Sequence, residues 1–187
     1  MKIDSESGNE KTFLNYLADL FRNDLGAVCV FDAFGNLIAR VTAKNCSGKP
    51  TILFVCHGDT VKPGMGIEPV VVGGVIRSEG DTILGADDKA GIAELYEAVF
   101  TADHHPELEI VITREEETAL MGARNLDIAE MKARMGFVLD GDKLNSIVIG
   151  GPSHMIIDVE ITGRAAHAGM EPEKGISAIL VASLLFL

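Results

Sequence analysis

Cysteine is scarce in this chain of 187 residues, which contains only Cys29, Cys46 and Cys56 and no CxxC spacing. The odd number argues against a disulfide framework, and the spacing argues against a zinc site built from thiolates. This usage fits a reducing compartment best, so we expect a cytoplasmic protein.

Positive charge is also in short supply. The chain has 16 lysines and arginines against 28 aspartates and glutamates, which gives a formal net charge of −12. Such a field repels phosphate backbones and anionic lipids, so we expect neither a nucleic-acid partner nor a membrane partner. No stretch approaches the roughly 20 apolar residues of a membrane span, and residues 1–8 lack the apolar segment of a signal peptide. The acidic excess suits divalent cations, although a solvated acidic surface explains the same composition.

Apolar residues make up 47% of the chain, which is enough for one buried domain and the start of a second. Helical spacing marks residues 10–23 and the segment after Asp87-Asp88, and paired short runs predict two hairpins. The hairpin strands are 27–31 with 37–41 and 69–72 with 75–78. Continuous apolar runs at 51–56, 108–113 and 136–139 are typical of buried strands. We therefore predict an α/β fold with a largely parallel sheet and flanking helices.

The pattern changes near residue 151. Apolar and polar residues alternate from Ile157 to Ile161, which predicts an antiparallel strand with one solvated face. Residues 176–187 are apolar on all sides of a helical wheel, which predicts a buried helix. We place one domain at 1–151 and the beginning of a small α+β domain at 152–187. Because chain ends are usually polar, we also expect the sequence to stop inside a helix of a longer protein.

Polar clusters follow the three apolar runs directly. His57-Gly58-Asp59, Glu115-Glu116-Glu117 and Asp140 occupy these positions, and Asp87-Asp88 opens a predicted helix. In open α/β sheets the functional crevice lies outside the carboxyl ends of the strands. One histidine with several carboxylates forms a ligand set suited to zinc or a similar divalent ion.

Each cluster has a plainer explanation when taken alone. The His-x-Asp pair can be a hydrogen bond at a strand end, and an aspartate before a helix can be an N-cap. Three glutamates can be a solvated charge run, and Asp140 can belong to a turn. The metal site would be absent only if all four of these explanations were true, so we favour the site.

Five sequence runs carry a family resemblance. They are HGDTV at 57–61, TILGADDKAG at 82–91, Glu116-Glu117 followed by Gly122-Ala123, GRAAHAG at 163–169 and PEKGI at 172–176. Taken in order along the whole chain, they resemble the peptidase T-like branch of the zinc aminopeptidase and aminoacylase family. The resemblance implies that 1–151 is the N-terminal part of a zinc-dependent catalytic domain. It implies that 152–187 begins a lid and dimerisation domain.

The resemblance also implies a ligand set for two zinc ions. His57 binds one ion, Asp87 bridges both, Glu117 binds the second, and Asp140 shares the first with His57. Relatives carry a further metal-binding histidine beyond the lid, which has no counterpart here. We therefore expect this chain alone to be inactive or weakly active.

Three further residues receive catalytic roles from the resemblance. Glu116 is the general base, Asp59 holds the His57 ring, and His167 hydrogen-bonds the developing oxyanion from the lid. Strand alternation puts Glu116 and Glu117 on opposite sides without saying which is base and which is ligand. The assignment rests on their spacing to Gly122-Ala123. Thr118-Ala119 departs from the family pattern and puts the local loop conformation in question.

The implied activity is hydrolysis of peptide bonds in short peptides by a water activated by two zinc ions. The resemblance also leads us to expect a homodimer formed through the lid. Two alternatives stay open. One is a deacylase of N-acyl amino acids with the same metals, and the other is a truncated metal-binding relative without catalysis.

Overall fold

The structure is a computed structural model that describes residues 1–141, 143, 145–151, 153 and 155–185. It divides into two compact units, residues 1–147 and residues 148–187. The predicted domain boundary lies between residues 151 and 152. Residues 152 and 154 are outside the described residues, and the boundary stays a prediction.

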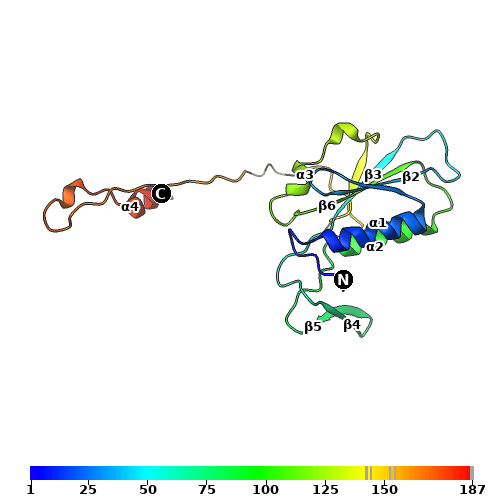
Figure 1. The fold of residues 1–187 in the computed structure, drawn as a ribbon, viewed down its shortest axis with the longest axis horizontal. Helices are drawn as coiled ribbons and strands as arrows, with labels where there is room; N and C mark the ends of the chain where they lie inside the picture. Colours follow the sequence, from blue (N-terminus) through cyan, green and yellow to red (C-terminus); the bar gives the residue numbers. More distant parts are fainter. Residues whose placement is uncertain (142, 144, 152, 154, 186–187) are drawn as a thin grey trace. The chain divides into compact units, whose positions relative to one another are not determined.

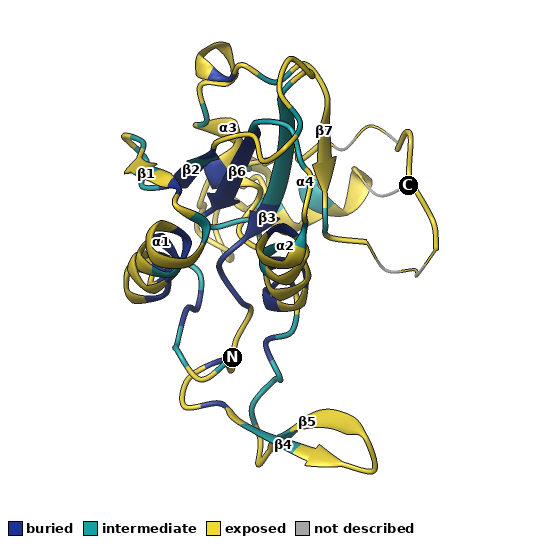
Figure 2. Cartoon of the chain, turned by 90° about the vertical axis from the view of Figure 1, so that its right-hand side faces the viewer, coloured by how far each residue is buried: buried dark blue, intermediate teal, exposed yellow. Residues whose placement is uncertain are grey.

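The first unit is built on a five-stranded sheet (Figure 1), in which the strand order is β1-β2-β6-β3-β7 (Figure 2). Its strands are β1 (Val28–Phe31), β2 (Leu37–Val41), β3 (Ile52–His57), β6 (Leu108–Thr113) and β7 (Gly136–Val138). β3 is parallel to both β6 and β7, while the β1–β2 hairpin joins β6 in antiparallel orientation. The predicted α/β class and the first hairpin are therefore confirmed, with a sheet that is parallel from β6 through β3 to the edge strand β7 and antiparallel on the side of β1 and β2.

Two helices, α1 (Lys11–Leu25) and α2 (Lys89–Thr101), lie on the same face of this sheet (Figure 2). Their apolar stripes form the main core with alternate residues of β2 and β6. Gly26 ends α1 in a left-handed conformation, with φ of 62°, which glycine adopts at no steric cost. Among the described residues, no helix has the length and apolar character that a bilayer crossing requires.

The opposite face of the sheet has a smaller core made of Ile38, Val111 and Met131. It is covered by the segment that contains α3 (Met121–Arg124) and the 3-10 turn η1 (Ile128–Glu130). Glu109 is fully buried on β6, and its carboxylate accepts hydrogen bonds from Arg40 and from the backbone N–H groups that follow Met131. This buried carboxylate fixes the path of the chain into β7.

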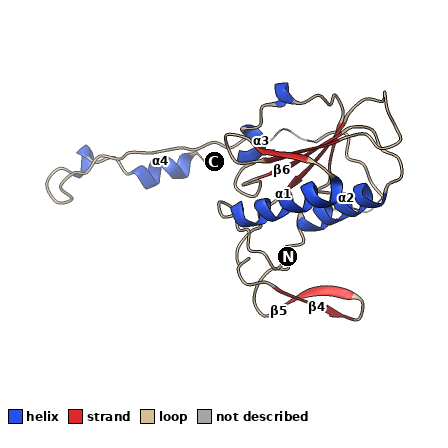
Figure 3. Ribbon diagram, turned by 45° about the vertical axis from the view of Figure 1, so that its right-hand side comes forward, coloured by secondary structure: helices blue, strands red, loops and turns tan. Residues whose placement is uncertain are grey.

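A separate two-stranded hairpin is formed by β4 (Glu68–Val72) and β5 (Val75–Glu79), as Figure 3 shows. Gly73 and Gly74 at its turn have φ of 59° and 79°, so the turn needs residues without a side chain. The second predicted hairpin is confirmed.

The second unit contains the 3-10 turn η2 (Pro172–Lys174) and the helix α4 (Ala178–Leu184), with an isolated bridge between Arg164 and Ile176. The predicted strand at Ile157–Ile161 is wrong for the described structure, because no neighbouring segment among residues 148–151, 153 and 155–185 pairs with it. The predicted terminal helix is present but exposed rather than buried, with Ile179 at 84% exposure. Residues 186 and 187 of that prediction lie outside the described residues.

Candidate metal centre

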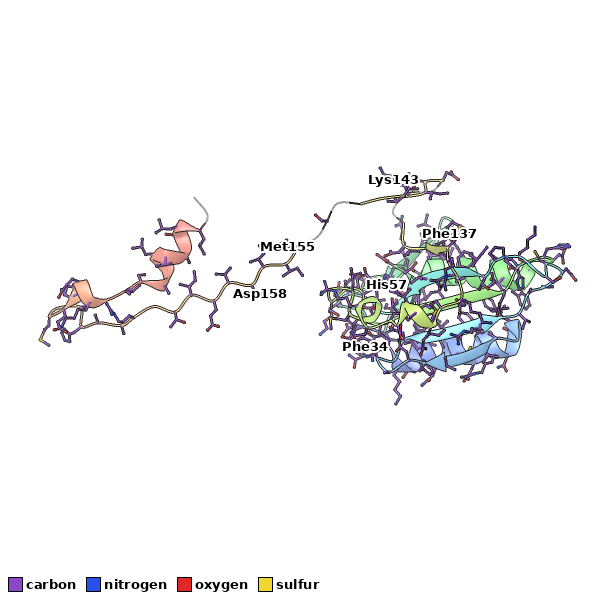
Figure 4. The ribbon with its side chains drawn as sticks, turned by 90° about the horizontal axis from the view of Figure 1, so that it is seen from above. Phe34, His57, Phe137, Lys143, Met155 and Asp158 are labelled. Carbon is purple, nitrogen blue, oxygen red and sulfur yellow. The ribbon has the colours of Figure 1, made fainter. Side chains whose placement is uncertain are left out.

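Parallel pairing brings two of the polar clusters to one edge of the sheet. His57, labelled in Figure 4, pairs in register with Thr113, which is the last residue of β6. The loop that carries the three glutamates therefore leaves the sheet beside the loop that carries Asp59. This is the geometry that the strand ends predicted.

His57 is almost fully buried and has a carboxylate residue on each side of its ring. Its Nδ1 lies 3.0 Å from the backbone oxygen of Asp59 and 3.4 Å from the Asp59 carboxylate. Its Nε2 lies 3.1 Å from Asp87 Oδ1. Burial alone lowers the pKa of His57, but the hydrogen bonds with Asp59 and Asp87 outweigh it and raise the pKa to about 10.

Three candidate ligands converge at this point. One donor atom each from His57, Asp87 and Glu117 lies within 4.8 Å of the others. His57 is buried, whereas Asp87 and Glu117 are exposed. The three come from β3, from the residues before α2 and from the loop after β6, so the fold assembles them from distant parts of the sequence.

Asp59 is fully buried and connects both loops of the site. Its carboxylate accepts a hydrogen bond from Ser7 Oγ at 2.7 Å, from the Glu116 N–H at 2.9 Å and from the Glu117 N–H at 3.2 Å. Burial raises the pKa of Asp59, but the hydrogen bonds from His57, Ser7 and these two amides lower it below its usual value. The carboxylate therefore stays charged and holds the glutamate loop against His57.

The glutamate loop departs from strand geometry as soon as β6 ends. Glu115 has φ of 50°, and its carboxylate Oε1 lies 3.2 Å from Nη2 of the Arg114 guanidinium. Glu117 contributes to the converging group, and Glu116 is half-buried next to it. Burial raises the pKa of both Glu116 and Glu117, and the carboxylate of Asp140 raises both further, while His57 acts in the opposite direction.

Asp140 follows β7 and is exposed. Among the described residues, it lies outside the three-residue group of converging donor atoms. Its negative charge nevertheless acts on His57, Glu116 and Glu117, so it lies near the same site.

Asp88 is a buried neighbour of the site that the sequence patterns did not single out for a role. It stands at the N-cap position of α2, but its side chain makes no capping hydrogen bond. Its Oδ2 instead accepts the His57 backbone N–H at 3.3 Å. Burial, opposed by the charge of His57, raises the pKa of Asp88 to about 7. The buried position of Asp88 against the strand end has no signal in local sequence, since an aspartate before a helix usually caps it.

His167 belongs to the second unit. Its Nδ1 accepts the backbone N–H groups of Gly169 and Met170, at 3.2 and 3.1 Å, which closes a local turn. Its predicted role at the oxyanion stays a prediction.

The donor set fits a divalent metal ion. An imidazole nitrogen and two carboxylate oxygens are ligands that zinc and similar ions accept, and no thiolate belongs to the group. The second nitrogen of the His57 ring is held by Asp59, as the outer partner of a metal-bound histidine usually is.

Comparison with known proteins gives related sequences, although no family model matches the chain. An uncharacterised protein of Bacillus subtilis, YqjE, is 41% identical over 196 residues, which covers 98% of this chain and 52% of that protein. Peptidase T of Clostridium perfringens is 33% identical over 158 residues, which covers 81% of this chain and 38% of that protein. The chain thus spans about half the length, or less, of these relatives.

Solved structures agree with the sequence relatives. The aminopeptidase PepT of Bacillus cereus has a TM-score of 0.75 and 35% identity, and the match covers 97% of this chain and 52% of that one. A tripeptidase of Staphylococcus aureus has a TM-score of 0.77 and 29% identity with the same coverage.

Proposed function

Because this chain belongs to the aminopeptidase family that includes peptidase T, we propose that it contributes a two-zinc site for hydrolysing peptide bonds in short peptides. The observation that carries the proposal is the convergence of donor atoms from His57, Asp87 and Glu117 within 4.8 Å. The names of its relatives, a tripeptidase and an aminopeptidase, favour short peptides over N-acyl amino acids as substrates.

We assign the metal ligands to His57, Asp87, Glu117 and Asp140. The first three are supported by their mutual distances, and Asp140 by its electrostatic influence on the site. A bound divalent ion supplies Lewis acidity, which polarises a carbonyl group and lowers the pKa of water.

Glu116 is the proposed general base, which accepts a proton on its carboxylate and passes it to the departing amine. Two contacts support this choice over its neighbours. The Glu115 side chain is paired with Arg114, and Glu117 already belongs to the converging group. The Glu116 backbone is fixed by its hydrogen bond to Asp59, which keeps the carboxylate at the site.

Asp59 orients the His57 ring through Nδ1, which is supported by its distances of 3.0 and 3.4 Å to that atom. His167 is the proposed partner of the developing oxyanion, supplied by a lid that begins in residues 152–187. Exposed apolar side chains on α4, including Ile179 and Leu180, support a homodimer formed through this region. The three free cysteines support a cytoplasmic location.

The test measures zinc content and peptidase activity together. In a protein that continues this chain through the full length of its relatives, we expect bound zinc, hydrolysis of tripeptides with a free amino group, and little hydrolysis of N-acetylated amino acids. This chain alone should be inactive or weakly active. Glu116→Gln should retain zinc and lose activity by about 10²- to 10⁴-fold, as removal of a general base does. Full activity in Glu116→Gln would reject Glu116 as the base. A protein without zinc would overturn the metal centre, and preference for acetylated substrates would favour the deacylase.

A further inference from the structure

Residues 3–10, which we call the N-terminal strap, run along the loop that follows β3 (dark blue in Figure 1). The strap and this loop exchange backbone hydrogen bonds, from Thr60 N–H to Ser5 O at 3.0 Å and from Ser7 N–H to Thr60 O at 3.2 Å. Glu6 adds a buried contact, since its carboxylate accepts the Gly64 N–H at 2.8 Å. The strap therefore fixes the loop that begins at His57.

The strap also reaches the glutamate loop. Glu10 is fully buried, and its carboxylate accepts the Glu115 N–H at 3.1 Å and Arg114 Nε at 3.0 Å. Ser7 Oγ donates to the same Asp59 carboxylate that holds the Glu116 and Glu117 amides. One short segment thus contacts both loops from which His57 and Glu117 arise.

A third contact joins the strap to the start of α2. Lys89 follows Asp87-Asp88 and is buried, with its ammonium 2.8 Å from the Ile3 backbone oxygen and 4.5 Å from the centre of the Phe13 ring. Each of the three sequence segments that supply the converging donor atoms is therefore tied to residues 3–10.

These contacts are directional. Hydrogen bonds to charged groups need one donor position and one acceptor position, whereas apolar contacts tolerate sliding. Glu6, Glu10 and Asp59 are all buried carboxylates, and burying a charge is costly unless its hydrogen bonds are satisfied. The strap is thus held in a single register against the site loops.

We propose that the N-terminal strap is a positioning element for the metal centre, in which Ser7 and Glu10 are positioning residues. Ser7 holds Asp59, which in turn holds the His57 ring and the Glu116-Glu117 backbone. Glu10 holds the loop at Glu115 and Arg114. This inference rests on the proposed function for its metal-binding consequence, but its effect on loop geometry is independent of metal.

The test compares Ser7→Ala with Ser47→Ala, a matched change at an exposed turn residue that belongs to neither loop. Hydrogen exchange of the Glu116 and Glu117 amides is measured in the metal-free chain. Losing a hydrogen bond to a charged carboxylate should speed their exchange about tenfold. Co²⁺ titration of the same proteins should show about tenfold weaker binding and a changed visible absorption spectrum for Ser7→Ala. Ser7→Thr, which keeps the hydroxyl, should restore both.

Glu10→Gln is the second variant, in case Ser7→Ala does not fold. It keeps the size of the side chain and removes its charge, and it should speed exchange of the Glu115 amide. Unchanged amide exchange in the folded variants, relative to Ser47→Ala, would overturn the strap proposal. Absence of Co²⁺ binding by the unsubstituted chain would instead overturn the metal centre, while amide exchange would still decide the role of the strap.

Discussion

Replacing Asp59 with asparagine tests the central contact of the site. The change preserves size but removes the charge and turns one acceptor oxygen into an amino group. Glu116 N–H bonds to Oδ1, whereas Glu117 N–H and Ser7 Oγ bond to Oδ2. Whichever oxygen is replaced, at least one backbone N–H then faces another donor. The Ser7 hydroxyl can rotate and accept a hydrogen bond, but a backbone N–H cannot.

The magnitude follows from these contacts. A hydrogen bond to a charged group contributes about 1.5–3 kcal/mol, and the surviving bonds become neutral and weaker. We therefore expect Asp59→Asn to lower the free energy of unfolding by about 2–4 kcal/mol, a large share of the roughly 5–15 kcal/mol of an ordinary domain.

Urea denaturation of the metal-free chain measures this loss. Asp81→Asn, at an exposed position, is the matched control and should stay within about 0.5 kcal/mol of the unsubstituted chain. If Asp59→Asn is as stable as Asp81→Asn, the Asp59 contacts do not hold the two loops together and the reasoning is wrong.

Two further predictions concern the same loops. A Cβ atom at Gly122 would lie 2.3 Å from the Arg114 carbonyl oxygen and 2.6 Å from Asn36 Oδ1, so Gly122→Ala should cost about 1–3 kcal/mol of stability and weaken Co²⁺ binding. Gly150→Ala, where the added atom meets open space, should change neither quantity in thermal melts and titrations. The raised pKa of His57, about 10, means that the metal-free chain carries a proton on this ring at neutral pH. Because a metal ion must displace that proton, Co²⁺ affinity should rise about tenfold per pH unit between roughly pH 6 and 8; an affinity independent of pH would contradict the assignment of His57 as a ligand.

The central strands and helices could be predicted because their signals are local. Leu108–Thr113 is a continuous apolar run, and in the structure it is the strand buried along its whole length. The apolar spacing at residues 10–23 likewise matches the buried stripe of α1. The edge of the sheet where His57 and the glutamates meet then followed from parallel pairing.

The roles of the three glutamates could not be read from alternation. Alternation applies only while the chain remains a strand, and β6 ends at Thr113. Glu115 then adopts a positive φ that redirects its side chain to Arg114. The Glu115 N–H is bound by the carboxylate of Glu10, which is more than a hundred residues earlier, so no local pattern contains this contact.

At Ile157–Ile161 the sequence pattern predicted a strand that the described structure does not contain. Its alternation predicts one solvated face and one buried face, but a strand exists only with a hydrogen-bonded neighbour. A pattern within one segment says nothing about whether its partner lies beside it.

The strand order of the sheet has a consequence for how the chain folds as it is synthesised. β2 and β3 are close in sequence, yet β6 lies between them, with Ala39 paired to Ile110 and Cys56 paired to Ile112. Neither strand has its β6 partner until residue 113 has left the ribosome. The first half of the unit therefore emerges with unpaired strand edges and uncovered apolar side chains. Such long-range pairing slows folding and leaves the nascent chain open to aggregation. Protection by a chaperone should therefore matter most before β6 appears.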